Sequence, residues 1–414
     1  MLLEVGQTIR VDMVLQPGEQ SQTITVTGEI PAIDTTDATL GGTVSNQAIN
    51  ALPLNGRNFE RLLQVRPGIV TNIGSTANNG SVTHGRRGGN DVLLVEGIAE
   101  VNPSTGVTTL NSSYRIGDAN SILPIDAIQE FNVEQNPKAE YGWGDGSIIN
   151  VGVKSGTNSI HGTAYAFGRD ASATDAANAF THTVTPATLE QFGGTAGGRI
   201  IKDKLFWFLG YEGLRTKLGD VALVTIPTDI STGDATTSMV DACNAIKNSG
   251  KAINALSAQL AGLNPATCVV SPASSTFENV FPYNPTSSTS YNPPLTTLGP
   301  LNNGFIKGDY VVNEHNHISA FYFISKSTQT ANYAAGQLLP QWEATIPSDV
   351  RVYTGSWTWT PNSTWLNDFR AGYSFLHAST FSGDADKTPV NPWPQGYGMN
   401  TGVTNPLYGG SAAI

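Results

Sequence analysis

The second half of the chain carries amphipathic strand patterns whose connections alternate between short and long. Alternating apolar and polar residues predict strands near residues 159–168, 190–201, 204–215, 304–312, 317–326, 350–360 and 364–376. The short turns are 202–203, 313–316 and 361–363. Short turns at one rim and long loops at the other are typical of a bacterial transmembrane barrel. We therefore expect strands and no helix beyond Ser159.

The two faces of these strands differ in polarity. One face of the last strand is apolar, and polar residues line the other. The apolar residues are Trp365, Phe369, Ala371, Tyr373 and Phe375. With Trp357 and Trp359, Trp365 resembles an aromatic girdle at the periplasmic side. Lys307, Asp309, Asp368 and Arg370 are predicted to point into a lumen. A soluble sandwich with one wet face is the alternative at this point.

Composition limits which kinds of partner the chain can bind. The chain has 22 basic and 33 acidic residues and a net charge of -11, without a Lys/Arg cluster. Binding to nucleic acid needs such a cluster, so we exclude nucleic acid as a partner. No stretch approaches the roughly 18 apolar residues of a membrane-spanning helix, so a membrane would be crossed by strands.

The N-terminal 30 residues have a strand pattern of their own. Apolar residues alternate at Ile9, Val11, Met13 and Leu15, and a second strand pattern follows a Pro-Gly turn at 17–18. We interpret residues 1–30 as the end of a small β-sandwich. Residues 1–15 do not form a signal peptide, so we expect the natural N-terminus to lie upstream.

Residues 31–158 have a mixed pattern that predicts a compact α+β unit. Helices are expected at 45–52 and 58–63, with a helical turn at 125–128. Phe59, Leu62 and Leu63 fall on one apolar face of the second helix. The expected strands are 92–95, 131–133 and 148–153.

Several short motifs occur in this unit in a fixed order. They are Leu-Pro-Leu-Asn-Gly-Arg-Asn-Phe at 52–59, Gly-Arg-Arg-Gly-Gly-Asn at 85–90, Val-Glu-Gly at 95–97 and Lys-Ser-Gly-Thr-Asn at 154–158. The ordered set resembles the plug of TonB-dependent outer-membrane receptors, with Glu96 where the family usually has Asp. The plug-motif residues are Asn55, Gly56, Arg57, Arg86, Gly88, Glu96 and Gly97.

The flanking segments extend this resemblance over nearly the whole chain. The start of the strand-rich region, from 161–165 to 211–213, is similar to the Oar-like branch of the family, and 1–30 is similar to the close of a carboxypeptidase-regulatory-like domain. The resemblance implies a mainly β protein with three parts. These are the end of a β-sandwich (1–30), an α+β plug (31–158) and the first strands of an incomplete antiparallel transmembrane β-barrel (159–414).

The resemblance also implies a function in the outer membrane of a Gram-negative bacterium. A family member imports an extracellular ligand when a TonB-type inner-membrane complex moves the plug, and outer-membrane lipid surrounds the barrel. The coupling segment would lie just before the plug, where the candidate residues are Ile24, Thr25, Val26 and Thr27. Strand addition would join it to its partner, although the same residues also suit a last sandwich strand. The ligand is not specified by the sequence.

Other sites receive little support. No nucleophile-elbow motif marks a catalytic triad, so we expect no enzyme, and nothing indicates a cofactor. His315 and His317 have the spacing of a metal pair on a strand but lack a third ligand nearby, so we expect no metal. Cys243 and Cys268 are a candidate disulfide in an oxidising compartment.

The number of predicted strands is too small for a closed barrel. Roughly seven strands cannot close around a plug, and an open edge in lipid leaves backbone groups unpaired. We therefore expect this sequence to be part of a longer gene product. The alternative function is that of a surface-exposed structural, adhesive or carbohydrate-binding β-protein without transport activity.

Overall fold

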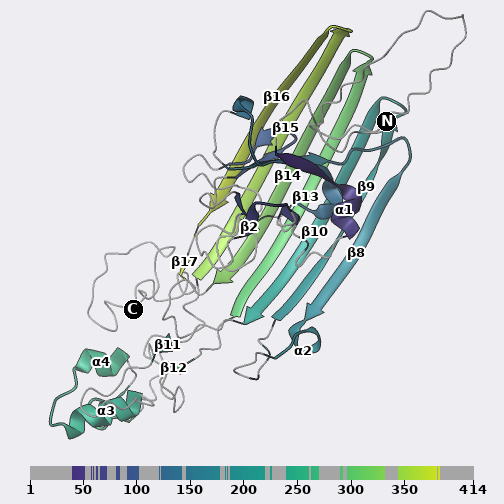
Figure 1. Cartoon of the computed structure of the whole chain (residues 1–414). Coiled ribbons are helices and arrows are strands. Elements are labelled where there is room, and N and C mark those ends of the chain that lie inside the picture. The colour runs from purple at the N-terminus through teal and green to yellow at the C-terminus, as the bar shows by residue number, and fades with distance from the viewer. Residues whose placement is uncertain are drawn as a thin grey trace, which may run out of the picture.

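Figure 1 shows the fold of the chain in a computed structural model. The structure describes residues 40–51, 57, 59, 62–63, 66–71, 81–83, 91–101, 121, 123–141, 146–177, 182, 184, 187–219, 224–225, 239–260, 263–269, 290–291, 296–331, 344–379 and 381–382. The predicted sandwich at 1–30, with the candidate coupling segment, lies outside these residues.

The largest element is one antiparallel sheet, here called the wall. Its strand order is β16-β15-β14-β13-β10-β9-β8, with β17 paired to β15, so neighbours in the sheet are neighbours along the chain. The strands are β8 (His161–Asp170), β9 (Ala187–Ile201), β10 (Leu205–Gly219), β13 (Thr296–Asn313), β14 (Asn316–Ala331), β15 (Ala344–Asn362), β16 (Trp365–Ala378) and β17 (Phe381–Ser382). All seven predicted strands are present, and each pair predicted to share a short turn is a hairpin.

The two ends of the wall differ as the alternating connections predict. Short turns lie at the upper end in Figure 1, and the long connections with their helices lie at the lower end. The outer face is apolar near the short turns, where exposed rings include Trp357, Trp359 and Trp365. The Trp357 and Trp359 rings stack with centroids 6.1 Å apart. Apolar side chains that face outward along the strands suit contact with lipid.

The second sheet, here called the small sheet, has the order β1-β6-β7-β4-β5. Only its β4–β7 pair is parallel among the strand pairs of the described residues. Its strands are β1 (Gly41–Ser45), β4 (Val92–Val95), β5 (Ile98–Ala99), β6 (Ile128–Glu134) and β7 (Ile148–Val153). Helix α1 (Asn46–Ala51), the 3-10 turns η3 (Ile125–Ala127) and η4 (Ala139–Tyr141), and the hairpin β2 (Ile69–Thr71) with β3 (Ser81–Thr83) complete this part.

The core of this part contains the side chains predicted for the second helix. Phe59, Leu62 and Leu63 are buried, and the Phe59 ring lies 5.5 Å from that of Phe131. Strand β6 places Phe131 and Val133 on the same buried face. The apolar positions read from the sequence therefore form the hydrophobic centre of the small sheet.

One expectation about the second half is wrong, because helices occur beyond Ser159. They are α2 (Ala171–Thr174), α3 (Met239–Asn248) and α4 (Ala255–Leu260). The Asp170 carboxylate caps α2 by accepting a hydrogen bond from the Ser172 backbone N–H at 2.9 Å. Helices α3 and α4 lie in the long connection between β10 and β13, which also holds the short pair β11 (Val224–Thr225) and β12 (Ser290–Tyr291). No described helix has the length and apolarity needed to span a bilayer.

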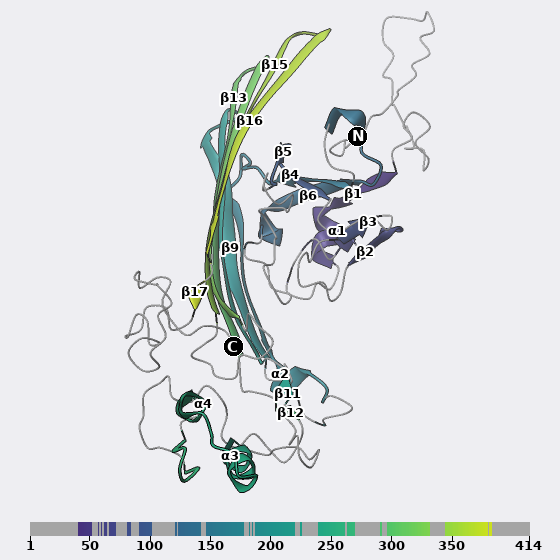
Figure 2. The same ribbon diagram turned by 90° about the vertical axis from the view of Figure 1, so that its left-hand side faces the viewer.

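The small sheet packs against one face of the wall, as Figure 2 shows. A single buried cluster runs from small-sheet residues such as Phe131 and Val153 into the wall. Its wall members are Phe208, Phe305, Phe321, Phe323 and Val352. The face of the wall that carries these side chains is called the inner face below. The two sheets therefore share a core, and their interface positions the candidate site.

Candidate functional site: the contact between the small sheet and the wall

The turn between β4 and β5 projects onto the wall. Its two residues, Glu96 and Gly97, have φ angles of 52° and 80°. A type I′ turn, which joins the strands of many hairpins, requires a positive φ at both of its central residues. Glycine adopts this conformation without strain, and its lack of a side chain lets Arg370 of β16 approach closely. The Val-Glu-Gly motif therefore forms a tight turn that brings a carboxylate to the wall.

The Glu96 carboxylate forms an ion pair across the interface. Lys307 Nζ of β13 lies 3.0 Å from Glu96 Oε1 and donates a second hydrogen bond to the Val153 carbonyl oxygen at 2.9 Å. The Val153 N–H donates to the same Glu96 oxygen at 2.6 Å. The Lys307 side chain is only 7% exposed and that of Glu96 18%. A charged pair this buried needs the additional hydrogen bonds that Val153 supplies.

Strand β16 contacts the same turn from the other side. Arg370 Nη1 donates to the Glu96 carbonyl oxygen at 3.4 Å, and Ser374 Oγ donates to the Glu100 carboxylate. Gly372 lies against Ile98, where a Cβ atom would collide with the isoleucine side chain. We call Glu96, Lys307 and Arg370 the Glu96 corner. It ties the small sheet to strands β13 and β16 of the wall.

A second contact, the Arg57 corner, comprises Arg57, Asp126, Tyr165 and Phe167. Arg57 Nη2 lies 2.6 Å from Asp126 Oδ2, and both residues precede the wall in the sequence. The guanidinium carbon lies 4.8 Å from the centre of the Tyr165 ring and 4.7 Å from that of Phe167, both on β8. The wall thus binds an already paired arginine through aromatic faces.

Charge at this corner also affects a nearby lysine. Burial lowers the pKa of the Lys154 ammonium from its usual value, and the neighbouring Asp126 carboxylate acts in the opposite direction. Thr163 of β8 lies 3.5 Å from Asp126 Oδ1, and the Tyr165 hydroxyl donates to Glu212 Oε2 at 2.6 Å. Asp126 therefore interacts with the small-sheet part and with the wall.

Four charged residues were predicted to face the lumen, and two of them contact the small sheet. Lys307 and Arg370 contact the small sheet, whereas the described contact of Asp309 is with His317 at 4.0 Å and that of Asp368 is with Arg370 at 2.7 Å. Between the two corners the interface is apolar, because the wall phenylalanines join the core of the small sheet. The interface is therefore mixed, and charge alone does not describe it.

This arrangement can be compared with known proteins. The family model described as "Outer membrane beta barrel domain" matches residues 152–414, which is more than half of the chain. The chain belongs to this outer-membrane barrel family. It is an outer-membrane protein, and the apolar outer face of the wall agrees with that location.

Two proteins similar to this outer-membrane barrel chain are named as a transporter and a receptor. The TonB-dependent transporter Oar of Myxococcus xanthus is 27% identical over 225 residues, which cover 50% of this chain and 20% of Oar. The ferric enterobactin receptor of Pseudomonas aeruginosa is 14% identical with a TM-score of 0.50, and the match covers 82% of this chain and 41% of the receptor. The second likeness concerns the fold alone.

A further solved structure, the outer-membrane transporter YddB of Escherichia coli, matches with a TM-score of 0.49 at 10% identity. The match covers 83% of this chain and 39% of YddB. The chain thus spans about a fifth of the length of Oar and about two fifths of these solved structures. None of the three names is that of an enzyme.

The plug-motif residues divide into described and undescribed sets. Arg57, Glu96 and Gly97 are described and lie at the two corners of the contact. Asn55, Gly56, Arg86 and Gly88 lie outside the described residues, as do the candidate coupling residues Ile24, Thr25, Val26 and Thr27. Arg370 was predicted to face inward and to make this interface polar, whereas Ser374 and the wall phenylalanines were not singled out as contact residues. Their position on the polar or apolar side of a strand was visible, but their partners were not.

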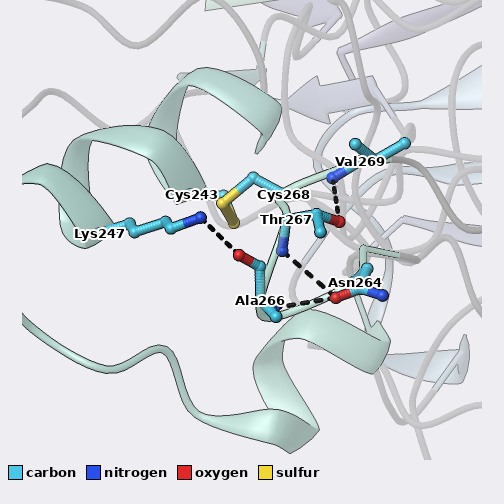
Figure 3. Close-up of a disulfide and its surroundings, with 7 residues drawn as sticks. All are labelled: Cys243, Lys247, Asn264, Ala266, Thr267, Cys268 and Val269. Carbon is cyan, nitrogen blue, oxygen red and sulfur yellow. Dashed lines mark hydrogen bonds between the residues drawn. A yellow bond between two sulfur atoms is a disulfide. The ribbon is translucent and has the colours of Figure 1, made fainter.

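The two cysteines lie in a compact part of the long connection, here called the loop unit (residues 239–269). Cys243 of α3 is joined to Cys268 by a disulfide, and both are buried (Figure 3). Lys247 Nζ donates to the Ala266 carbonyl oxygen at 2.5 Å, and Asn264 Oδ1 accepts from the Ala266 N–H at 2.9 Å. The disulfide and the Lys247 bond hold α3 against the segment after α4, and the Asn264 bond closes a turn within that segment.

The histidine pair has no metal-binding geometry in this outer-membrane barrel. His315 Nδ1 lies 2.7 Å from the Thr360 carbonyl oxygen, and His317 faces Asp309. No group of three or more His, Cys, Asp or Glu side chains suited to a metal ion occurs within the described part of the chain.

Proposed function

We propose that this chain forms the plug and the first barrel strands of an outer-membrane transporter of the Oar-like branch. Its parts are the end of a carboxypeptidase-regulatory-like domain (1–30), a plug (31–158) and the beginning of the barrel (159–414). An extracellular ligand binds on the side of the long connections, and energy-coupled movement of the plug opens a path for it. The plug and the segment before it face the periplasm.

The observation that carries this proposal is the ion pair between Glu96 and Lys307. It joins the small sheet to the wall rather than two strands of the same sheet. When the two parts separate, water can take the place of each partner, because both groups are strongly hydrated once exposed. A contact of this kind is suited to an interface that opens and closes again, which is the requirement for a plug.

Energy for this movement would come from a TonB-type complex in the inner membrane. The short turns of the wall would face the periplasm, and residues 24–27 precede the small sheet. The alternating pattern of Ile24, Thr25, Val26 and Thr27 suits strand addition to the edge of a partner sheet. We assign the coupling contact to this segment.

The experiment compares Val26→Pro with Val26→Thr in the receptor that carries this chain. Proline removes a backbone N–H donor and disfavours strand pairing, whereas threonine keeps the preference for a strand. Binding to the purified periplasmic domain of the TonB-type protein is measured by calorimetry. We expect Val26→Pro to abolish binding and Val26→Thr to retain it. Equal binding by both variants would place the coupling contact elsewhere.

A growth assay tests transport itself. Producing and non-producing cells are compared on ferric chelates, glycans and peptides as sole sources, with and without the TonB-type protein. Import predicts growth that requires both the receptor and the TonB-type protein. Ligand binding without any such growth advantage would favour the surface-exposed adhesive or carbohydrate-binding protein considered from the sequence.

A further inference from the structure

The segment that joins the small sheet to the wall is held against the first short turn. It comprises residues 154–160, between β7 and β8, and carries the Lys-Ser-Gly-Thr-Asn motif. Asn158 Nδ2 donates to Asp203 Oδ1 at 2.6 Å, and the Asp203 N–H donates back to Asn158 Oδ1 at 3.0 Å. Asp203 lies in the turn between β9 and β10 with a φ of 57°, a conformation that aspartate and asparagine adopt more readily than most residues. We call this reciprocal pair the Asn158 clip.

Gly156 brings the same segment onto the backbone of the β9–β10 hairpin. A Cβ atom at Gly156 would collide with the carbonyl oxygens of Trp207 and Gly198, two residues that are opposite each other in the register. Glycine allows this close approach because it has no side chain. Gly156 and Asn158 therefore fix the linker at two points of the hairpin, just before β8 begins at His161.

The outer face of β8 gives little information about the register of this strand. Strand β8 is at the edge of the wall in Figure 1 and pairs with β9 alone among the described strands. A strand face without large side chains can shift along its partner with little change in packing, and a shift of two residues keeps each side chain on its own face. The outward residues of β8 are all small: Gly162, Ala164, Ala166 and Gly168. The outer face therefore does not distinguish the observed register from one shifted by two residues.

The register of β8 matters for the contact with the small sheet. Tyr165 and Phe167 place two rings against the Arg57 guanidinium. The Tyr165 hydroxyl also donates to Glu212 of β10. A shift of two residues, or about 7 Å, would leave Arg57 with one ring and would put Thr163 or Phe167 beside Glu212. The Arg57 corner therefore depends on a register that the outer face of β8 does not specify.

The Asn158 clip fits the observed register and not a shifted one. Ser159 and Ile160 are the two residues between the clip and the start of β8. A shift of β8 by about 7 Å along β9 would pull this short connection away from the turn that holds Asp203. Both hydrogen bonds of the clip would then be lost. One of them has a carboxylate acceptor, which makes it stronger than a bond between neutral groups.

We propose that Asn158 and Asp203 are positioning residues that select the register of β8 and thereby place the wall side of the Arg57 corner. The clip joins the linker to the β9–β10 hairpin, which is closed by its own short turn, so the clip forms between neighbouring parts of the chain. Gly156 supports the clip by keeping the linker close to the hairpin backbone. This role concerns the structure of the wall and does not depend on the proposed transport function.

Disulfide trapping measures the register in outer membranes that contain the receptor carrying this chain. Phe192 of β9 is opposite Ala166, so Phe192→Cys with Ala166→Cys reports the observed register. Phe192→Cys with Ala164→Cys or Gly168→Cys reports a shift of two residues in either direction, because these positions are diagonal to Phe192 and about 7–8 Å away in the observed register. Copper phenanthroline oxidises the pairs, and linked peptides are quantified by mass spectrometry with the native disulfide as internal standard.

The Asn158→Asp variant removes the amide donor and places two carboxylates together. We expect the ratio of shifted to observed cross-links to rise at least about fivefold, because the hydrogen bonds of the clip are lost or weakened. Adding Asp203→Asn restores a donor opposite the new carboxylate, and the ratio should return to within about twofold of the parent value. A role in stability alone would lower all cross-links together without changing the ratio. An unchanged ratio in Asn158→Asp, or no recovery in the double variant, would overturn the proposal.

Asn362→Asp is the matched control at another short turn. Asn362 Oδ1 accepts from the Thr364 and Trp365 N–H groups, and a carboxylate can accept the same two bonds. This variant should leave the ratio unchanged, and a rise equal to that of Asn158→Asp would overturn the proposal as a general effect of charge. Asn158→Ser removes the amide without adding charge, and it should raise the ratio in the same way if Asn158→Asp does not assemble.

Limited proteolysis of the small sheet tests the link to the Arg57 corner. Asn158→Asp and Arg57→Lys should each speed cleavage, and their combination should be cleaved less than about twofold faster than the quicker single variant, because both weaken the same contact. Asn158→Asp with Lys307→Met should give the product of two separate increases, because Lys307 acts at the Glu96 corner. Multiplicative effects in both combinations would overturn the role of the clip at the Arg57 corner.

Discussion

The Glu96 corner and the Arg57 corner hold the small sheet against the same wall by different means. At the Glu96 corner the ion pair crosses the interface, so separation leaves a carboxylate and an ammonium without each other. At the Arg57 corner both charged partners belong to the small-sheet part, and the wall contributes the rings of Tyr165 and Phe167. Separation there keeps the ion pair intact. Removing one charged partner at the Glu96 corner should therefore cost more docking free energy than a comparable change at the Arg57 corner.

The largest expected effect comes from Lys307→Met. The substitution leaves the Glu96 carboxylate buried without its cation, which should reduce the free energy of unfolding by about 3–5 kcal/mol. Urea unfolding followed by tryptophan fluorescence measures the change. The double variant Glu96→Gln with Lys307→Met should recover most of the loss, because no unpaired charge is left. If Lys307→Met were as stable as the parent, docking would depend only on the apolar cluster that the wall phenylalanines share with the small sheet.

Gly97→Ala should have the second-largest effect and reduce the free energy of unfolding by about 1–3 kcal/mol. An alanine at this position would have a φ of 80° and would also collide with the Arg370 guanidinium. Gly250→Ala is the matched control, because Gly250 has a φ of 73° but nothing within 4 Å of an added Cβ atom. The difference between the two melting temperatures reports the contact with β16. Equal losses would show that Arg370 moves away freely.

Arg57→Lys should have a smaller effect and weaken the docking of the small sheet on the wall by about 1 kcal/mol. Lysine keeps the charge near Asp126 but loses the planar group that lies over both rings. Arg169→Lys provides the comparison at an exposed arginine that pairs with Asp175. Limited proteolysis of the small sheet measures docking in both variants. Similar cleavage rates for Arg57→Lys and Arg169→Lys would contradict a role for the aromatic rings.

Asp368→Asn should have the smallest effect, under about 1 kcal/mol, because the pair with Arg370 is solvent-exposed and screened. Its dependence on salt sharpens the comparison between corners. Raising the salt concentration should leave the Lys307→Met loss nearly unchanged and remove the Asp368→Asn loss. A loss at Asp368 that persists in high salt would mean that Arg370 is fixed by Asp368 for its contact with Glu96.

The sequence predicted the wall better than it predicted the contact. Period-2 alternation at Trp365–Phe375 depends only on which face of one strand is apolar, so the strands and hairpins of the wall are confirmed. The strands run further than predicted, for example to Gly219 in β10, because pairing with β13 stabilises residues beyond the amphipathic pattern. Helices α3 and α4 were missed because the whole connection that contains them was interpreted as a loop. Its later part is rich in Ser, Thr, Asn and Pro, and the helical part was not distinguished from it.

The contact residues were harder to predict for a physical reason. Lys307 is recognisable as inward-facing, but its partner Glu96 is 211 residues away in the sequence and belongs to another sheet. Phe305, Phe321 and Phe323 carry the signal of any buried strand, and no local pattern says what they contact. The family resemblance brought Arg57, Glu96 and Gly97 forward as motif residues. It did not indicate that they divide between two different corners.

The disulfide of the loop unit has a consequence for assembly. The loop unit lies between β10 and β13, so the bond between Cys243 and Cys268 shortens the path that must close before these strands pair. Because closure entropy grows only with the logarithm of length, this shortening changes the pairing by just a few tenths of a kcal/mol or so. The same bond should stabilise the loop unit itself by about 2–4 kcal/mol. The loop unit is thus energetically separate from the wall, and its length and sequence are free to diversify while the barrel strands keep their register.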